Sequence, residues 1–181
     1  MSNWPAIARR IRVPLGFAFA GFYVWLARPT PRSIALGGAL ALPGLILRAF
    51  ASGYVQKNEA LTTSGPYAYT RNPLYLGSLI IAAGFAVAAR GWWIAAAMLA
   101  LFVAVYLPVI HSEEEFLRQR FPQFSDYAHQ VPRLWPRIPS FRHRGGSFSW
   151  GLYRKHREYN AIIGSVTLLA ALAAKLLWIS Y

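Results

Sequence analysis

The chain has 181 residues, of which 56% are apolar and only 14% are charged, whereas roughly 25% of the residues in an average soluble domain are charged. A chain of this length is expected to form one domain, and so small a core cannot hide this much apolar surface. A soluble monomer and a disordered chain are therefore both disfavoured. Basic loops at a membrane surface explain the formal net charge of +13, so we expect membrane lipid, and no nucleic acid, as a partner.

Five stretches of the chain contain no Asp, Glu, Lys or Arg, namely residues 13–27, 33–47, 72–89, 91–112 and 159–174. A membrane-spanning helix needs about 17–25 residues. The third and fourth stretches reach this length alone. The first, second and fifth stretches reach the required length when charged residues at their ends, such as Arg48 and Lys175, lie inside the helix or extend their side chains to the interface. We therefore predict an all-α, polytopic membrane protein with five transmembrane helices.

The basic residues are distributed unequally between the two sides of this arrangement. The N-terminal segment and the second and fourth loops carry 14 of the 19 Lys and Arg residues, and the other side carries four. Because cytoplasmic loops are enriched in Lys and Arg, we predict that the N-terminus and both of these loops are cytoplasmic. The C-terminus is then expected on the opposite side.

The second loop ends in Arg71, Asn72 and Pro73, just before the third predicted span. Asn is a favoured N-cap and Pro is favoured in the first helical turn. A helix N-terminus beside a fixed cation suits a carboxylate or a phosphate. The alternative interpretation is a simple capped helix whose arginine extends to the interface.

The fourth loop opens with three adjacent carboxylates, Glu113, Glu114 and Glu115. Ser112 and Glu115 have the spacing of a capping box, which predicts that a new helix begins there. Anionic lipids would repel these acids, and a ligand that carries an ammonium or sulfonium charge would explain them. The alternative is that they pair with Arg118 and Arg120.

Three further features have simpler interpretations. Phe121, Phe124 and Tyr127 are spaced like the apolar face of a helix on the membrane surface, which predicts an interfacial anchor. Arg48 lies inside the second span, so it is either a site residue or a side chain that extends to the interface. Four scattered histidines and no cysteine predict that no metal is bound.

Two segments together resemble a known family. GPYAYTRNPLYLG resembles the GPYxxxRHPxYxG motif of integral membrane methyltransferases, and EEEFLRQRFPQFSDYAHQVPRLWP resembles their second conserved segment. This family includes the isoprenylcysteine carboxyl methyltransferases and the phospholipid methyltransferases. The resemblance covers residues 61–136. We expect a single domain over residues 1–181, with a small cytoplasmic helical cap, a linker over 137–158 and an additional transmembrane helix over 159–181.

The resemblance implies an enzyme that uses S-adenosylmethionine to methylate a lipophilic or small acceptor, such as an isoprenylcysteine carboxylate, a lipid amine or a thiol. It implies a donor pocket between the two cytoplasmic segments. The implied cofactor-binding residues are Tyr67, Arg71, Asn72, Pro73, Tyr75, Gly77, Glu113, Glu114 and Tyr127. The implied catalytic residues are Arg71, Glu114 and Arg133.

The chain departs from the family pattern at two positions. Asn72 replaces the motif histidine and cannot become cationic. Ala82 stands where the isoprenylcysteine enzymes have a tryptophan, which disfavours that particular acceptor. Two alternatives stay open: an NADPH-dependent membrane reductase of the sterol and steroid type, whose related motif usually has an acid where this chain has Ser78, and a non-catalytic membrane scaffold.

Overall fold

The computed structural model describes residues 7, 16, 18–56, 59–138 and 146–179, and every regular element in this part of the chain is a helix. The predicted all-α class is therefore confirmed for these residues. A helical stretch over residues 18–26 comes first. The elements that follow are α2 (Pro31–Tyr54), the 3-10 helix η1 (Gly65–Ala68), α3 (Pro73–Ala89), α4 (Trp92–Leu101), the π-helix η2 (Phe102–Tyr106), α5 (Leu107–Arg120), α6 (Phe124–Gln130), α7 (Trp150–Lys155) and α8 (Tyr159–Ile179).

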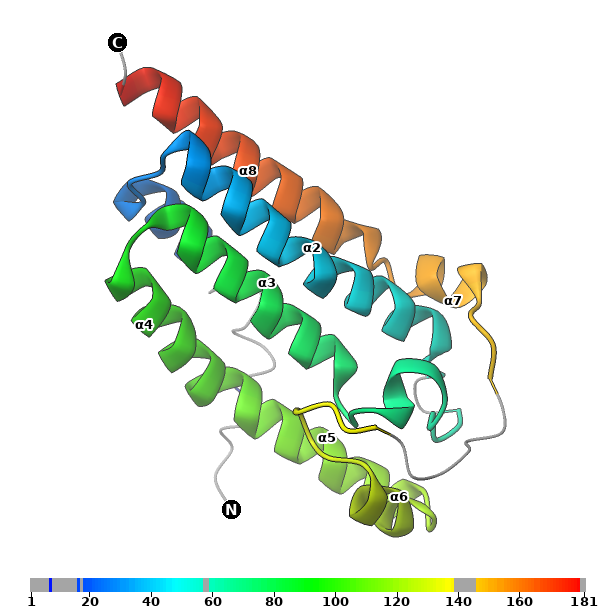
Figure 1. The fold of residues 1–181 in the computed structure, drawn as a ribbon. Helices are drawn as coiled ribbons and strands as arrows, with labels where there is room; N and C mark the ends of the chain where they lie inside the picture. The colour runs from blue at the N-terminus through cyan, green and yellow to red at the C-terminus, as the bar shows by residue number, and fades with distance from the viewer. Residues whose placement is uncertain (1–6, 8–15, 17, 57–58, 139–145, 180–181) are drawn as a thin grey trace.

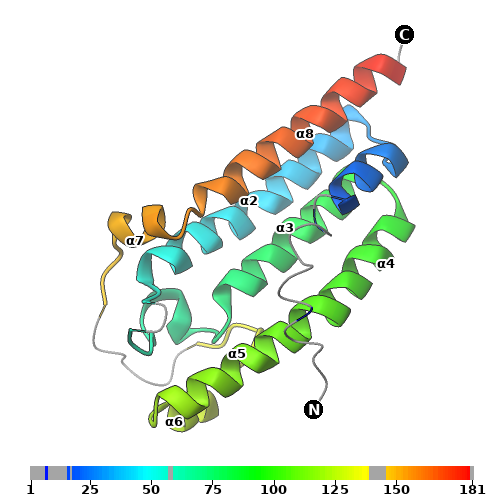
Figure 2. The same cartoon turned by 180° about the vertical axis from the view of Figure 1, so that it is seen from behind.

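The long helices lie side by side and alternate in direction (Figures 1 and 2). Helix α3 runs back along α2, the α4–α5 rod returns beside α3, and α8 lies along α2. One end of the bundle therefore holds the end of α2, η1, the start of α3, α6 and α7. We call this the loop end. Both segments that resemble the methyltransferase motifs lie there.

Glycines on facing sides of α2 and α3 allow these two helices to approach closely. A Cβ added to Gly37 would lie 2.5 Å from the carbonyl oxygen of Gly84, and one added to Gly44 would lie 2.6 Å from that of Gly77. Small residues at a helix crossing are typical of membrane bundles, because packing and not the hydrophobic effect drives association there. The contact fixes α3, and therefore its N-terminus, against α2.

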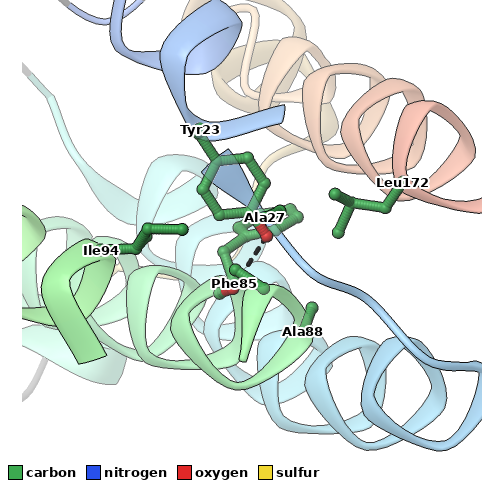
Figure 3. Close-up of a cluster of buried hydrophobic side chains, with 7 residues drawn as sticks. Tyr23, Ala27, Phe85, Ala88, Ile94 and Leu172 are labelled. Atoms are coloured by element: carbon green, nitrogen blue, oxygen red, sulfur yellow. Dashed lines mark hydrogen bonds between the residues drawn. The ribbon is translucent and has the colours of Figure 1, made fainter. Parts of the chain in front are cut away.

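At the end opposite the loop end, a buried cluster joins four parts of the chain (Figure 3). Tyr23 packs on Phe85 in an edge-to-face arrangement, with ring centroids 5.9 Å apart, and its hydroxyl donates a 2.8 Å hydrogen bond to the carbonyl oxygen of Phe85. Ile94 from α4 and Leu172 from α8 complete the cluster. The predicted additional helix is therefore part of the core of the bundle.

Helices α4, η2 and α5 form one continuous rod over Trp92–Arg120. Its π-helical turn ends just before Pro108, whose ring nitrogen cannot donate the hydrogen bond that a regular helix needs. The predicted capping box at Ser112 and Glu115 is wrong, because α5 passes through both positions without a break. The helix accommodates Pro108 and continues through Ser112 to Arg120, beyond the apolar stretch.

Three described helices are long and apolar enough to cross a membrane: Pro31–Tyr54, Trp92–Arg120 and Tyr159–Trp178. The third predicted span forms the shorter apolar helix α3, with 17 residues. The first predicted span lies partly outside the described residues. The chain is thus a membrane protein by the length and composition of its helices, while the count of five spans and the predicted orientation stay predictions.

The predicted linker contains a short helix in its described part. Helix α7 lies beside the end of α2, where the amide of Ser149 donates a 2.9 Å hydrogen bond to the carbonyl oxygen of Gly53. The Phe148 ring packs against Phe50 and Tyr54. The C-terminal part of the chain is therefore attached to the loop end before α8 begins.

Alanine substitutions at two glycines should have opposite effects on stability, because Gly44 lies at the close crossing of α2 and α3 and Gly164 does not. Gly44→Ala should destabilise the protein by about 1–3 kcal/mol, because the added Cβ would overlap the backbone of α3. Gly164→Ala in α8 should be neutral or stabilising, because nothing lies within 4 Å of its added Cβ and alanine favours a helix. The thermal unfolding midpoints of the purified variants in detergent measure both effects. Equal midpoints for the two variants would contradict the close crossing.

Candidate functional site

The two segments predicted to form a site are joined directly at the loop end. The amide of Arg71 donates a 2.9 Å hydrogen bond to the carbonyl oxygen of Pro132, and the amide of Arg137 donates one of 3.0 Å to that of Tyr69. Between them, the Thr70 hydroxyl donates a 3.1 Å bond to the carbonyl oxygen of Arg133. These bonds hold the chain before α3 beside the chain after α6.

Glu114 is the centre of the polar contacts at this junction. Asn72 Nδ2 donates a 2.9 Å hydrogen bond to Glu114 Oε1, and Arg133 Nε and Nη2 lie 3.0 and 2.8 Å from Oε2. Arg71 Nε lies 3.5 Å from Oε1. Glu114 is only 4% exposed, so its charge depends on these partners and not on water. The predicted alternative, that Glu114 pairs with Arg118 and Arg120, is wrong.

Asn72 occupies the predicted N-cap position of α3, and Pro73 follows in the first turn. The asparagine side chain does not cap the helix, however. Its amide nitrogen donates to Glu114 and, at 3.1 Å, to the carbonyl oxygen of Arg133. A side-chain amide has two N–H donors, so the residue that replaces the motif histidine bonds two parts of the second segment at once.

A cavity of about 820 Å³ lies beside this cluster, within the range of about 300–1,000 Å³ that small-molecule sites occupy. It is lined from the loop after α2, from η1, from the start of α3, and from α5 and α6. The predicted site residues that line it are Tyr67, Arg71, Asn72, Pro73, Tyr75, Glu113, Glu114 and Tyr127.

Two predicted site residues are not among the residues that line this cavity. Gly77 packs against α2, where an added Cβ would lie 2.6 Å from Arg48 Cγ. Arg133 contributes its contacts to Glu114 from outside the cavity wall, and its side chain is 46% exposed. Gly77 therefore fits a packing role, and Arg133 orients Glu114 from the outer side.

Two aromatic residues of the second segment, Phe124 and Tyr127, point inward, whereas Phe116 and Trp135 are exposed. Phe124 and Tyr127 are 1% and 6% exposed and pack with Val131, Leu117 and other apolar residues. The predicted interfacial anchor is therefore wrong for these two residues, because the face that carries them covers the cavity. The Tyr127 hydroxyl donates a 2.7 Å hydrogen bond to the carbonyl oxygen of Tyr67.

Burial governs the ionisation of the groups around the cavity. Burial raises the pKa of both tyrosine hydroxyls, Tyr67 and Tyr127, and keeps them neutral. The neighbouring Glu113 carboxylate raises the pKa of Tyr67 further. Burial lowers the pKa of Arg71, and Glu114 opposes this effect.

Glu113 and Arg71 both line the cavity and carry opposite charges. Glu113 is an exposed carboxylate in the cavity wall. Arg71 Nε is buried, yet it makes no hydrogen bond to any part of the chain that the structure describes. The cavity wall therefore carries an anionic side chain, Glu113, and a cationic side chain, Arg71.

Several lining residues were not singled out as site residues from the sequence, among them Gln56, Leu61 and Thr62. They belong to the loop between α2 and η1, which is part of the charged segment over residues 56–71, and the length of that segment between two apolar stretches was its only signal. His111 also lines the cavity. Among the described residues, no group of three or more metal-ligating side chains lies together.

Comparison with known proteins gives a family match that overlaps the segments forming this site. Residues 35–123 match the family described as phospholipid methyltransferase, which confirms the resemblance for this part of the chain. The matched residues contain α2 except its first turn, all of α3, α4 and α5, and most of the cavity wall.

Two curated relatives carry names of another kind. The chain is 34% identical over 119 residues to the cobalt-zinc-cadmium resistance protein CzcN of Cupriavidus metallidurans, covering 65% of this chain and 53% of the relative. It is 36% identical over 87 residues to the nickel-cobalt-cadmium resistance protein NccN of Alcaligenes xylosoxydans xylosoxydans, covering 48% and 41%. The chain thus matches about half of the length of these relatives or less. No solved structure matches it.

The geometry of the cluster predicts different effects for two neighbouring glutamates. Glu114→Gln should destabilise the protein by about 3 kcal/mol, because it leaves Arg71 without a buried counter-ion. For a chain of this size, that corresponds to a thermal midpoint lower by roughly 6–12 °C. Glu115→Gln should change the midpoint little, because Glu115 is exposed and its side chain accepts an exposed hydrogen bond from the amide of Gln119. Equal midpoints would show that Glu114 is not the centre of the junction.

Proposed function

We propose that this chain is an S-adenosylmethionine-dependent methyltransferase of the membrane, and that the cavity at the loop end holds the methyl donor. The observation that carries the proposal is the junction at Glu114, where the two family segments meet and wall one cavity. The family match supports membrane methyltransferase activity in general. The donor, the acceptor and the residue roles belong to the proposal.

The groups in the cavity wall fit the chemistry of the donor. S-adenosylmethionine carries an ammonium, a carboxylate, ribose hydroxyls, an aromatic base and a methyl group on a cationic sulfonium, which makes that methyl group electrophilic. The exposed carboxylate of Glu113 suits the ammonium or the ribose hydroxyls. The guanidinium of Arg71, which lines the cavity, suits the carboxylate. The faces of Tyr67 and Tyr75 suit the base or the sulfonium.

In this arrangement Glu114 acts mainly by holding its neighbours. It fixes Arg71 and Asn72 at the start of α3 and Arg133 after α6. Methyl transfer is an in-line displacement, so the main task of the protein is to align donor and acceptor. A carboxylate or thiolate acceptor needs no base. An amine needs a proton acceptor, and the candidates in the cavity wall are His111 and Glu114.

We further propose that the acceptor is lipophilic and reaches the site from the membrane, while the polar donor enters from the cytoplasm. The apolar helices that carry the cavity support this division. The bias of basic residues toward the loop end supports a cytoplasmic N-terminus and cytoplasmic motif loops. The replacement of the tryptophan of the isoprenylcysteine enzymes by Ala82 favours an acceptor other than a prenylated cysteine. Lipid amines and thiols are therefore favoured as acceptors over a prenylated cysteine.

Donor identity can be tested by titrating purified protein with S-adenosylhomocysteine and, separately, with NADPH, while the thermal unfolding midpoint is measured. The proposal predicts stabilisation by S-adenosylhomocysteine and none by NADPH. Stabilisation by NADPH alone would favour a membrane reductase, and stabilisation by neither would favour a scaffold. Mass spectrometry of membrane extracts incubated with methyl-labelled donor would then identify the acceptor.

The role of Glu113 gives a second test. Glu113→Gln should weaken binding of S-adenosylhomocysteine by about 1.5–3 kcal/mol, roughly ten- to a hundredfold, because it removes a charged hydrogen bond. Asp126→Asn is the matched control, since Asp126 is an exposed acid on α6 that does not line the cavity. Isothermal titration calorimetry measures both. An unchanged dissociation constant for Glu113→Gln would remove this residue from the donor site.

A further inference from the structure

Arg48 joins three parts of the chain that lie far apart in sequence. Its guanidinium forms a two-pronged contact with Glu158, with Nε and Nη2 at 3.0 and 2.7 Å from Oε2. Its Nη1 donates to the Ser78 hydroxyl at 2.5 Å and to the carbonyl oxygen of Leu74 at 3.2 Å. The side chains of Arg48 and Glu158 are 22% and 12% exposed. Arg48 therefore neither extends freely to the interface nor lines the cavity.

The atoms that Arg48 contacts on α3 belong to the first two turns of that helix. Leu74 lines the cavity and follows directly after Asn72 and Pro73. The Arg48 side chain passes over Gly77, where a Cβ would lie 2.6 Å from its Cγ. The position of this guanidinium is thus coupled to the position of the cavity wall.

Glu158 lies in the turn between α7 and α8, outside the segment that matches the methyltransferase family. Arg157 before it has the left-handed value φ 53°, which turns the chain into α8. His156 Nδ1 lies 3.0 Å from the carbonyl oxygen of Ser52 at the end of α2. These contacts present the Glu158 carboxylate to Arg48.

The Arg48 side chain is largely buried, and a cation in such a place needs a counter-ion because an unpaired charge with little access to water is costly. Without Glu158, the guanidinium would have to move toward water, and its bonds to Leu74 and Ser78 would be lost. The charges of Arg48 and Glu158 also act on Tyr67 in the cavity wall, where Arg48 lowers and Glu158 raises the pKa of the hydroxyl.

We propose that Glu158 and Arg48 are a positioning pair through which the C-terminal segment fixes the first turns of α3, and thereby the affinity of the cavity for its ligand. The pair acts through α3 and does not touch the ligand itself. The assignment of that ligand as the methyl donor rests on the proposed function. The effect on α3 does not depend on it.

The test compares Glu158→Gln with Lys155→Gln. Lys155 at the end of α7 forms an exposed ion pair, at 3.2 Å, with Glu59 in the loop after α2. Hydrogen–deuterium exchange should accelerate at the amides of residues 73–78 in Glu158→Gln and stay unchanged in Lys155→Gln. Calorimetry should show S-adenosylhomocysteine binding about five- to tenfold weaker in Glu158→Gln only, the low end of typical coupling between linked sites.

A second variant separates positioning from general stability. Arg48→Lys retains a charge for Glu158 but lacks the planar fork that reaches both Glu158 and α3. It should therefore lose less thermal stability than Glu158→Gln while it weakens ligand binding to a similar extent. Unchanged exchange at residues 73–78 together with unchanged affinity in Glu158→Gln would overturn the positioning role. Faster exchange in a protein whose wild type binds no S-adenosylhomocysteine would support positioning and overturn the proposed function instead.

Discussion

The buried carboxylate of Glu114 is the interaction on which the loop end depends. It is 4% exposed and is neutralised by Arg71 and Arg133, which come from two segments about 60 residues apart, and it accepts a further hydrogen bond from Asn72. Burying a carboxylate is costly unless its partners are all in place. The stable arrangement is therefore one in which the chain before α3 and the chain after α6 are both docked on α5. A cavity walled by these three parts follows from that docking.

The helices beneath this cluster fix its position from the membrane side. Glycines at the crossing of α2 and α3 bring the backbones into contact, and the same absence of a side chain at Gly77 leaves space for Arg48. Arg48 then connects the first turns of α3 with Glu158 at the start of the C-terminal helix. A polar site at the end of a membrane bundle is thus supported by close packing on one side and by a second, partly buried ion pair on the other.

Much of this arrangement can be predicted from the sequence. The apolar stretches predict the long helices, and the even number of spans between the two motif loops predicts that both loops lie at one end. Asn72 and Pro73 predict the start of α3 correctly. The residues involved, Arg71, Asn72 and the three glutamates, are recognisable because charged and polar residues are rare in this chain.

The remaining details depend on facts that a sequence does not contain. Which of the adjacent residues Glu113 and Glu114 is buried depends on the rotation of α5, and the continuity of that helix overrides the capping pattern at Ser112. The inward orientation of Phe124 and Tyr127 depends on the docking of α6. The partner of Arg48 lies 110 residues further along the chain, beyond the reach of any local pattern.

Photoaffinity labelling tests the central claim most directly. A photoreactive azidoadenosyl analogue of S-adenosylmethionine can be cross-linked to the purified protein and the labelled peptides mapped by mass spectrometry. The account predicts label in two separate segments, residues 60–76 and 111–127, with both signals lost when S-adenosylhomocysteine is added in excess. Protected label confined to α8 or to the end of the bundle opposite these segments, or label that S-adenosylhomocysteine does not displace, would contradict it.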